Sequence, residues 1–112
     1  MHARTMAKSK VWLEKEGNVI YGDGRQALLK AIDQTGSIRQ AASKLGMSYR
    51  AAWGKLKATE ERLGIELVSK KAGGADSGTS LTENGREFMR KYEQFKKESN
   101  DTIDKIHTKY FE

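Results

Sequence analysis

Two short helical segments joined by a very short turn, within residues 37–63, constrain the fold of this chain more than any other feature. Ser37 and Ser48 stand where helix N-caps are expected, and the first of the two helices stops at Gly46. The small side chains of Ala41 and Ala42 are expected to let the second helix approach the first closely. This spacing is typical of a helix-turn-helix unit, although an unrelated helical hairpin has the same pattern.

The second helix, over residues 48–63, is predicted to have two distinct faces. Its inward face is marked by steps of four and three residues between Ala52, Leu56, Thr59 and Leu63. Its outward face carries two aromatic side chains, two basic side chains and a glycine, namely Tyr49, Arg50, Trp53, Gly54 and Lys57. Such a face near a helix N-terminus suits a recognition helix in the major groove of DNA. The alternative makes the aromatic residues core and the cations a solvated face, but the inward stripe already supplies the core contacts.

A glycine-rich segment follows this helix and is predicted to be a wing. Residues 65–71 and 80–81 have the composition of short strands, and the loop over 72–79 contains no apolar anchor. Lys70 and Lys71 lie at the base of this hairpin and Gly74 in its tip. We therefore predict that residues 70–80 contact the DNA backbone or the minor groove. A hairpin tip without a partner has the same composition and is the alternative.

The predicted DNA-contacting residues combine the helix-turn-helix and the wing. They are Ser37, Ser48, Tyr49, Arg50, Trp53, Lys57, Lys70, Lys71 and Gly74. Ser48 is expected to hold a phosphate through its hydroxyl or through the neighbouring backbone N–H groups. The charge balance agrees with such a partner, because 21 Lys and Arg against 15 Asp and Glu give a formal net charge of +6.

The remaining segments complete a mainly α fold with small β-hairpins. Residues 1–9 are expected to be a disordered leader, and residues 10–82 a winged helix-turn-helix domain with an N-terminal hairpin. Residues 83–112 are predicted to form a long C-terminal dimerisation helix. Its heptad-like stripe consists of Phe88, Tyr92, Phe95, Ser99, Thr102, Ile106 and Lys109. The alternative is a helix folded back over its own domain, burying its first aromatic residues there.

Catalytic and metal chemistry find no support in the sequence. The absence of cysteine excludes disulfides and thiolate metal sites. His2 and His107 lie at opposite ends of the chain, so they do not form a pair at metal-ligand spacing. Glu60 and Glu61 are interpreted as a solvated helix face and not as a catalytic carboxylate pair. We therefore expect no enzymatic activity, no cofactor and no metal.

Nucleotide binding and membrane insertion are also disfavoured. Gly73 and Gly78 have the spacing of a phosphate-binding loop, but Thr79 stands where that motif requires lysine. No segment approaches the ~20 apolar residues of a membrane span. The N-terminus lacks the apolar core of a signal peptide. We expect a cytoplasmic protein without a membrane partner.

With these residues in view, the chain resembles the winged helix-turn-helix of LysR-type regulators. The resemblance rests on Gly36-Ser37-Ile38, Ala41-Ala42, Leu45, Ser48, Leu63-Gly64, Leu67-Val68, Lys70, Leu81-Thr82 and Gly85. The run from Ser48 to Trp53 and the wing from Gly73 to Gly78 are similar to ModE-type, molybdate-responsive regulators. The resemblance implies a homodimer on a partly palindromic operator, with Tyr49, Arg50 and Trp53 facing DNA and Lys70 at the wing base.

One departure from the ModE pattern shapes the functional expectation. ModE-type regulators generally continue into oxyanion-binding domains after the long helix, whereas this sequence stops at Glu112. The resemblance therefore implies the DNA-binding half without the molybdate-binding domains. A ligand response would then need a separate ligand-sensing partner protein; otherwise DNA binding is constitutive and controlled by expression. A protein-interaction module that keeps the winged-helix fold without binding DNA is the alternative, because fold does not fix function.

Overall fold

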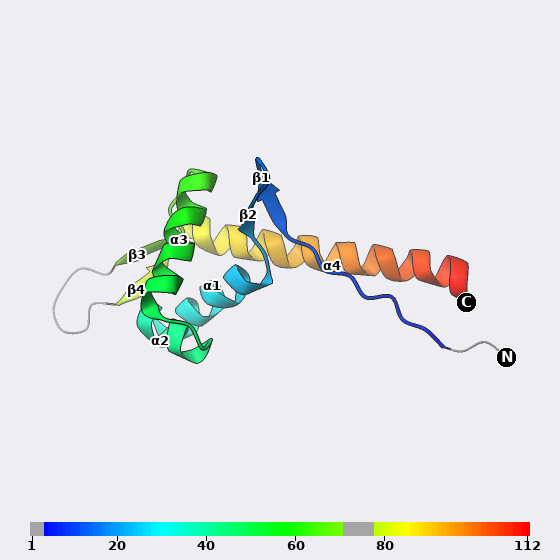
Figure 1. The fold of residues 1–112 in the computed structure, drawn as a ribbon, viewed down its shortest axis with the longest axis horizontal. Coiled ribbons are helices and arrows are strands. Elements are labelled where there is room, and N and C mark those ends of the chain that lie inside the picture. The colour runs from blue at the N-terminus through cyan, green and yellow to red at the C-terminus, as the bar shows by residue number, and fades with distance from the viewer. Residues whose placement is uncertain (1–3, 71–77) are drawn as a thin grey trace.

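The computed structural model describes residues 4–70 and 78–112, and within them a small helical domain carries one long helix (Figure 1). In chain order the elements are β1 (Leu13–Lys15), β2 (Asn18–Tyr21), α1 (Asp23–Thr35), α2 (Ile38–Lys44), α3 (Tyr49–Leu63), β3 (Val68–Lys70), β4 (Thr79–Leu81) and α4 (Glu83–Phe111). The predicted fold class, mainly α with small β-hairpins and a long C-terminal helix, is confirmed.

The core of the domain lies where α1, α2 and α3 meet. Its largest fully buried side chains are Tyr21, Leu28, Leu29, Ile32, Leu67 and Thr59. Helix α1 contributes three of these six side chains, Leu28, Leu29 and Ile32, because its apolar residues recur at helical spacing along one face. The helix ends at Gly36, whose φ of 71° is the left-handed conformation that glycine adopts readily.

Both predicted N-caps of the helix-turn-helix are confirmed. The Ser37 hydroxyl accepts a hydrogen bond from the Gln40 backbone N–H at 3.0 Å, which begins α2. The Ser48 hydroxyl accepts one from the Ala51 N–H at 3.0 Å, which begins α3. Each bond satisfies a backbone donor that has no partner inside its helix, so the sequence itself fixes where the two helices begin.

Two antiparallel two-stranded sheets flank the helices. Strands β1 and β2 form the expected N-terminal hairpin, in which Leu13 pairs with Tyr21. Strands β3 and β4 form the base of the expected wing, in which Val68 pairs with Leu81 and Lys70 with Thr79. The predicted wing residues Lys71 and Gly74 lie outside the described residues.

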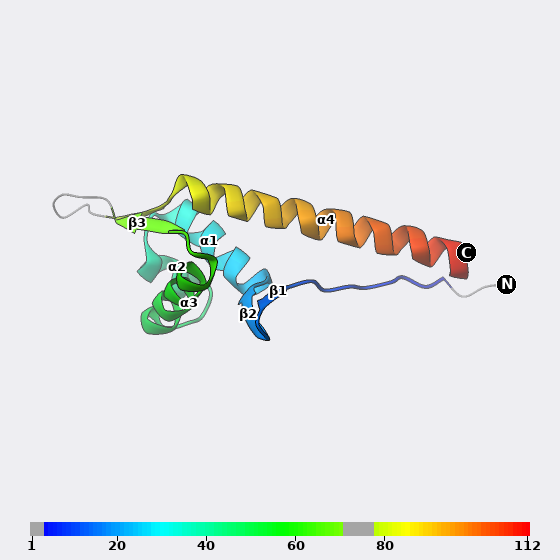
Figure 2. The same cartoon turned by 90° about the horizontal axis from the view of Figure 1, so that it is seen from above.

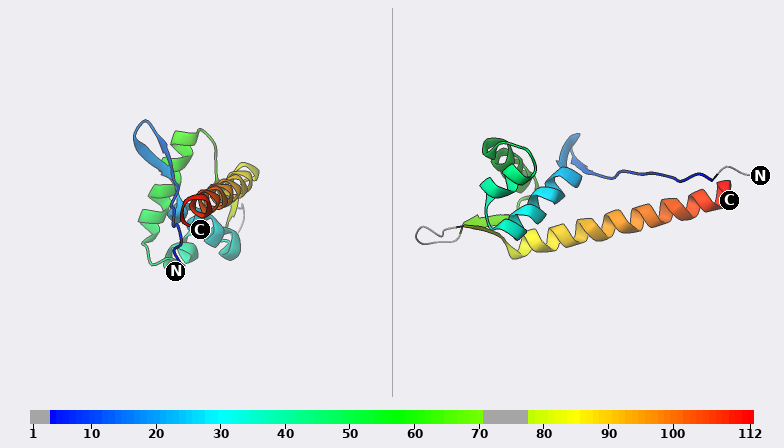
Figure 3. Two further views of the ribbon diagram at one scale, coloured as in Figure 1. Left: turned by 90° about the vertical axis from the view of Figure 1, so that its right-hand side faces the viewer. Right: turned by 90° about the horizontal axis from the view of Figure 1, so that it is seen from below.

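Helix α4 begins on the domain and then runs away from it (Figures 2 and 3). Only Gly85 and Tyr92 of its 29 residues are buried, and both lie in its first half. Ring contacts of Tyr21 with Phe88 and Tyr92, at centroid distances of 4.7 and 4.9 Å, hold that half against the core. The second half has no comparable contact with the described part of the domain, which gives the molecule a length of 66 Å against a width of 29 Å.

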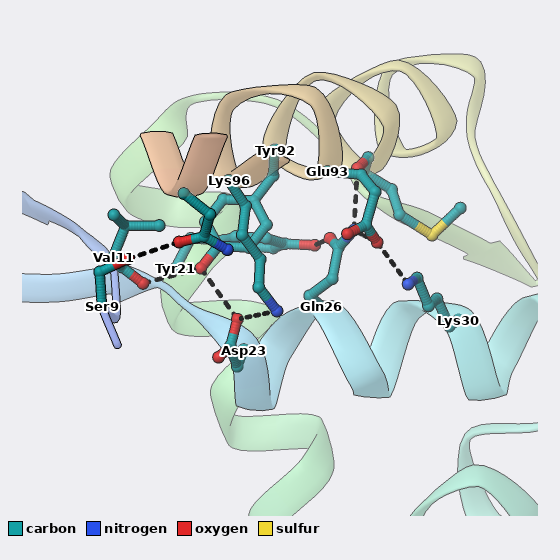
Figure 4. Close-up of polar contacts among 11 residues, drawn as sticks. Ser9, Val11, Tyr21, Asp23, Gln26, Lys30, Tyr92, Glu93 and Lys96 are labelled. Atoms are coloured by element: carbon teal, nitrogen blue, oxygen red, sulfur yellow. Dashed lines mark hydrogen bonds and ion pairs between the residues drawn. The ribbon is translucent and has the colours of Figure 1, made fainter. Parts of the chain in front are cut away.

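A polar network fixes the direction in which α4 leaves the domain (Figure 4). Gln26 of α1 accepts a hydrogen bond from the Tyr21 hydroxyl and donates one to the Met89 carbonyl of α4 at 2.9 Å. The Tyr92 hydroxyl is shared between the Val11 carbonyl at 2.9 Å and the Asp23 carboxylate at 3.2 Å. Burial, followed by the charge of Asp23, raises the pKa of Tyr92 to about 12, so the hydroxyl keeps its proton for these bonds.

Ion pairs extend this network along α4. Lys96 lies 3.1 Å from the Asp23 carboxylate, and Lys30 of α1 pairs with Glu93. The hydrogen bond from Lys96 is the main reason that the pKa of Asp23 lies below its usual value. A hydrogen bond from Lys30 does the same for the pKa of Glu93. Both carboxylates are thus kept charged at the junction between α1 and α4.

The N-terminal segment runs beside α4, as two views of the ribbon show (Figures 2 and 3). Ser9 donates a hydrogen bond to the Asn100 side chain at 2.6 Å, and the Thr5 hydroxyl lies 2.7 Å from Nε2 of His107. Residues 1–9 were expected to be a disordered leader. The structure describes residues 4–9 as extended chain along the helix, while residues 1–3 lie outside the described residues.

The start of α4 is set by a close backbone contact at Gly85. Thr82 caps the helix, because its hydroxyl accepts from the Gly85 N–H at 2.9 Å while its own N–H donates to the Leu67 carbonyl at 2.9 Å. Gly85 is buried, and a Cβ atom added there would lie 2.2 Å from the Leu67 carbonyl oxygen. The absence of a side chain at this position therefore lets α4 and the base of the wing touch.

Replacing Gly85 by alanine is expected to lower the free energy of unfolding by about 1–3 kcal/mol, because backbone must shift to admit the methyl group. The thermal midpoint should fall by several degrees in a circular dichroism melt. Gly24→Ala is the matched control, since a Cβ atom at that position of α1 meets nothing within 4 Å. If the thermal midpoint of Gly85→Ala equalled that of Gly24→Ala, the backbone of α4 at Gly85 would not lie close to the Leu67 carbonyl.

Candidate nucleic-acid interface

Helix α3 presents a face to solvent that we call the reading face, formed by Arg50, Trp53, Gly54 and Lys57. All of these residues are exposed, and Trp53 keeps 43% of its surface accessible. On the opposite side of the helix, Ala52, Leu56 and Thr59 are buried. The predicted division of α3 into two faces is confirmed for these residues, and the core contacts of one face hold the other outward.

Tyr49 differs from the prediction that it faces outward. Its side chain is half-buried and packs against the hydrophobic core cluster. The Arg39 guanidinium of α2 lies 4.6 Å from the ring centroid and covers it, in a cation–π arrangement. Tyr49 thus joins α3 to α2. The side chain that is exposed to solvent above the Tyr49 ring is the cation of Arg39. Sequence reasoning missed Arg39 because it lies outside the outward stripe of α3.

Ser37 and Ser48 lie at the N-termini of α2 and α3, with their hydroxyl oxygens occupied as caps. Ser48 is exposed, and Ser37 is half-buried. The N-terminus of α3 lies beside Arg50, so that the positive end of the helix dipole and a guanidinium share one region of the surface. Such a region favours a phosphate oxygen, and the hydroxyl proton of Ser48 stays available for donation.

Lys57 is held in place by two neighbours on its own helix. Its ammonium nitrogen lies 5.6 Å from the Trp53 ring centroid and 3.1 Å from Oε1 of Glu60. Glu60 also accepts hydrogen bonds through Oε2, at 2.8 Å from the Leu67 N–H and 3.2 Å from the Val68 N–H. These contacts link the reading face to Leu67 and to Val68, the first residue of β3.

The interpretation of Glu60 and Glu61 as a solvated face is wrong for Glu60. The Glu60 side chain is only 11% exposed, whereas Glu61 is exposed as expected. Helical periodicity did not reveal the difference because the partners of Glu60 are backbone amides beyond the turn at Gly64. A side chain that hydrogen-bonds backbone in another element leaves no pattern in its own helix.

The C-terminal half of α3 is supported by the N-terminal hairpin. The Thr59 hydroxyl donates to the Ile20 carbonyl at 3.0 Å and accepts from Nε of Arg25 at 2.9 Å. Arg62 donates to the Val19 carbonyl at 3.1 Å, and Lys15 donates to the Arg62 carbonyl at 2.9 Å. Burial, and then the charge of Arg62, lowers the pKa of Arg25. These basic residues therefore serve as structural contacts that orient α3.

The base of the wing lies beside the helix-turn-helix. Lys70 is exposed at the end of β3, opposite Thr79. The Thr79 N–H donates to the Gly36 carbonyl at 2.8 Å, which ties β4 to the turn between α1 and α2. Lys70 is thereby presented from an anchored strand, while the predicted contacts at Lys71 and Gly74 fall outside the described residues.

The described ranges 4–70 and 78–112 hold neither a candidate metal site nor a candidate membrane span. In those ranges no group of three or more His, Cys, Asp or Glu side chains could hold a metal ion. None of the helices described there is long and apolar enough to cross a membrane.

Comparison with known proteins connects this geometry to a family. Residues 25–86, from α1 to the first turn of α4, match the family model described as "Bacterial regulatory helix-turn-helix protein, lysR family". The chain belongs to this LysR family. The matched region contains α2, α3 and both strands of the wing base.

Several curated relatives of this LysR-family chain carry names linked to molybdenum. The "Molybdenum transport protein ModE" of Azotobacter vinelandii is 31% identical over 99 residues, which cover 88% of this chain and 37% of that protein. The "Molybdenum-pterin-binding protein MopB" of Rhodobacter capsulatus is 41% identical over 83 residues, covering 73% and 30%. The "Transcriptional regulator ModE" of Haemophilus influenzae is 37% identical over 70 residues, covering 62% and 28%. The chain thus spans less than two fifths of the length of these relatives.

Solved structures share the fold of this LysR-family domain. A crystal structure of the CbnR_DBD–DNA complex matches with a TM-score of 0.58 and 20% identity, covering 76% of this chain and 93% of that one. A crystal structure of Vibrio fischeri DarR in complex with DNA matches with a TM-score of 0.57 and 19% identity, covering 75% and 27%. At this level of identity the likeness extends to the fold.

Proposed function

We propose that this chain is a sequence-specific DNA-binding module of a transcriptional regulator, with α3 in the major groove and residues 70–80 against the backbone or the minor groove. The observation that carries the proposal is the reading face. It places Arg50, an exposed Trp53 and Lys57 together on a side of α3 that the core does not use. An α-helix fits the major groove of B-form DNA, and side chains on such a face reach the base edges.

Several residues of the reading face and its surroundings each suit a particular kind of contact. Arg50 can donate two hydrogen bonds to a guanine, which is the commonest specific contact in the major groove. Trp53 offers an apolar surface to a thymine methyl group, and Gly54 leaves room for the nucleic acid beside it. Ser48 and the N-terminus of α3 suit a phosphate. Lys70 suits the backbone, where its charge adds affinity for every sequence alike.

Family and charge support the same proposal. The chain belongs to a family of bacterial regulatory helix-turn-helix proteins, and relatives similar in sequence are named transcriptional regulators. The formal net charge of +6 favours association with a polyanion. Because phosphate contacts release counterions, affinity for DNA should fall as salt rises.

Dimerisation through α4 is a second part of the proposal. We propose that the exposed face of α4 is covered by the same helix of a second copy of this chain. Phe88 and Tyr92 pack on the domain, which accounts for the first turns of the stripe. Further along, Phe95, Ile106 and Tyr110 are 43%, 51% and 67% exposed. A stripe with steps of three and four residues is complementary to itself in a two-stranded helix pair. Two copies would then present two recognition helices to two half-sites.

Arg50→Ala is expected to weaken binding to the preferred duplex by about 1–3 kcal/mol, roughly 5- to 150-fold, and to relax base preference at one position in each half-site. Fluorescence anisotropy with the preferred and a scrambled duplex measures both effects. Lys55→Ala is the matched control, because it removes a cation that is also exposed but lies on another side of α3. Equal affinity of wild type and Arg50→Ala for the preferred duplex would contradict the groove assignment. A wild type that ignores all duplexes at low salt would favour a protein-interaction module.

Ile106→Glu is expected to convert a dimer into a monomer, because it replaces the exposed apolar side chain of the stripe near the C-terminal end of α4 by a charge. Light scattering at micromolar concentration gives the mass directly. Thr108→Glu introduces the same charge two residues away, at an exposed position outside the stripe, and should leave the dimer intact. A monomeric mass for wild type would overturn the dimer proposal.

A further inference from the structure

Glu60 contacts two parts of the candidate interface at once. Through Oε2 it accepts hydrogen bonds from the N–H groups of Leu67 and Val68, at 2.8 and 3.2 Å, where β3 begins. Through Oε1 it lies 3.1 Å from the ammonium group of Lys57 on the reading face. With only 11% of its side chain exposed, the carboxylate is confined to this orientation.

The two oxygens have different requirements. A neutral carbonyl oxygen accepts hydrogen bonds from backbone amides as a carboxylate oxygen does, so the contact with Leu67 and Val68 needs no charge at Glu60. The contact with Lys57 does need it, because only the carboxylate neutralises the ammonium group. The negative charge of Glu60 therefore matters for Lys57 on the reading face. The contact with the base of the wing requires only a hydrogen-bond acceptor in the position of Oε2.

We propose that Glu60 is a positioning residue that fixes the wing base relative to α3 and holds Lys57 over Trp53, and that its charge limits the affinity of the reading face for DNA of any sequence. This inference rests on the proposed DNA binding. A phosphate that approaches Lys57 must compete with a carboxylate already bound to it. Lys57 thus adds less sequence-independent affinity than a free lysine would, which leaves discrimination to Arg50 and Trp53.

Glu60→Gln separates the two roles. The glutamine carbonyl can still accept from the Leu67 and Val68 amides, but its NH2 group cannot accept from the Lys57 ammonium. The plot of log affinity against log salt concentration should become steeper by up to about 0.9, the value of one additional phosphate contact. Affinity for a scrambled duplex should rise several-fold. The amide resonances of Leu67 and Val68 should stay near their wild-type positions in Glu60→Gln and move in Glu60→Ala.

Two controls isolate the pair with Lys57. Glu61→Gln changes the net charge by the same amount at an exposed neighbouring position and should alter the salt dependence far less. In a Lys57→Ala background, Glu60→Gln should change the salt dependence no more than Glu61→Gln does. Equal salt dependence of Glu60→Gln and Glu61→Gln, with a wild type that binds DNA, would overturn this inference alone. A wild type that binds no duplex would overturn the proposed function and this inference together.

Discussion

The close packing of α3 on α1 and α2 is the contact on which the rest of the interface depends. Ala41, Ala42 and Ala52 are completely or almost completely buried where the helices meet. Methyl groups at these positions keep the helix axes close, and a larger side chain would force them apart. Because one face of α3 packs in this contact, the rotation of α3 about its own axis is determined. Arg50 and Trp53, on the opposite face, therefore point to solvent.

The other elements hold this arrangement at its edges. The N-terminal hairpin binds the C-terminal half of α3 through Thr59 and Arg62. Thr79 and Glu60 tie the wing base to the turn after α1 and to α3. A binding surface made of a helix and a hairpin benefits from such links, because contacts held in advance cost less entropy on association. In the same way, the hydrogen bonds of Gln26 hold the direction in which α4 leaves the domain. In a dimer paired through α4, this direction would set the distance between the two domains.

Local signals in the sequence were sufficient to predict where the helices of the helix-turn-helix begin and which side of α3 is buried. Ser37 and Ser48 are capping residues whose effect extends over a single turn, so the starts of α2 and α3 could be predicted. The steps between Ala52, Leu56 and Thr59 gave the buried side of α3 in the same way. What could not be predicted depends on partners in other elements or segments of the chain. Arg39 covers Tyr49, ten residues later, Glu60 binds amides across a turn, and Ser9 hydrogen-bonds Asn100.

Sequence-specific DNA binding by a dimer is tested most directly by selecting bound duplexes from a random-sequence library, with purified protein at near-physiological salt. The proposed position of α3 in the major groove and the proposed pairing of two copies through α4 together predict an enriched motif with two inverted half-sites. The half-sites should lie about 10–10.5 base pairs apart from centre to centre, or a multiple of that spacing. Retention of DNA without an enriched motif would contradict sequence-specific reading by Arg50 and Trp53. Enrichment of a single half-site would contradict the dimer, and no retention at all would contradict DNA binding itself.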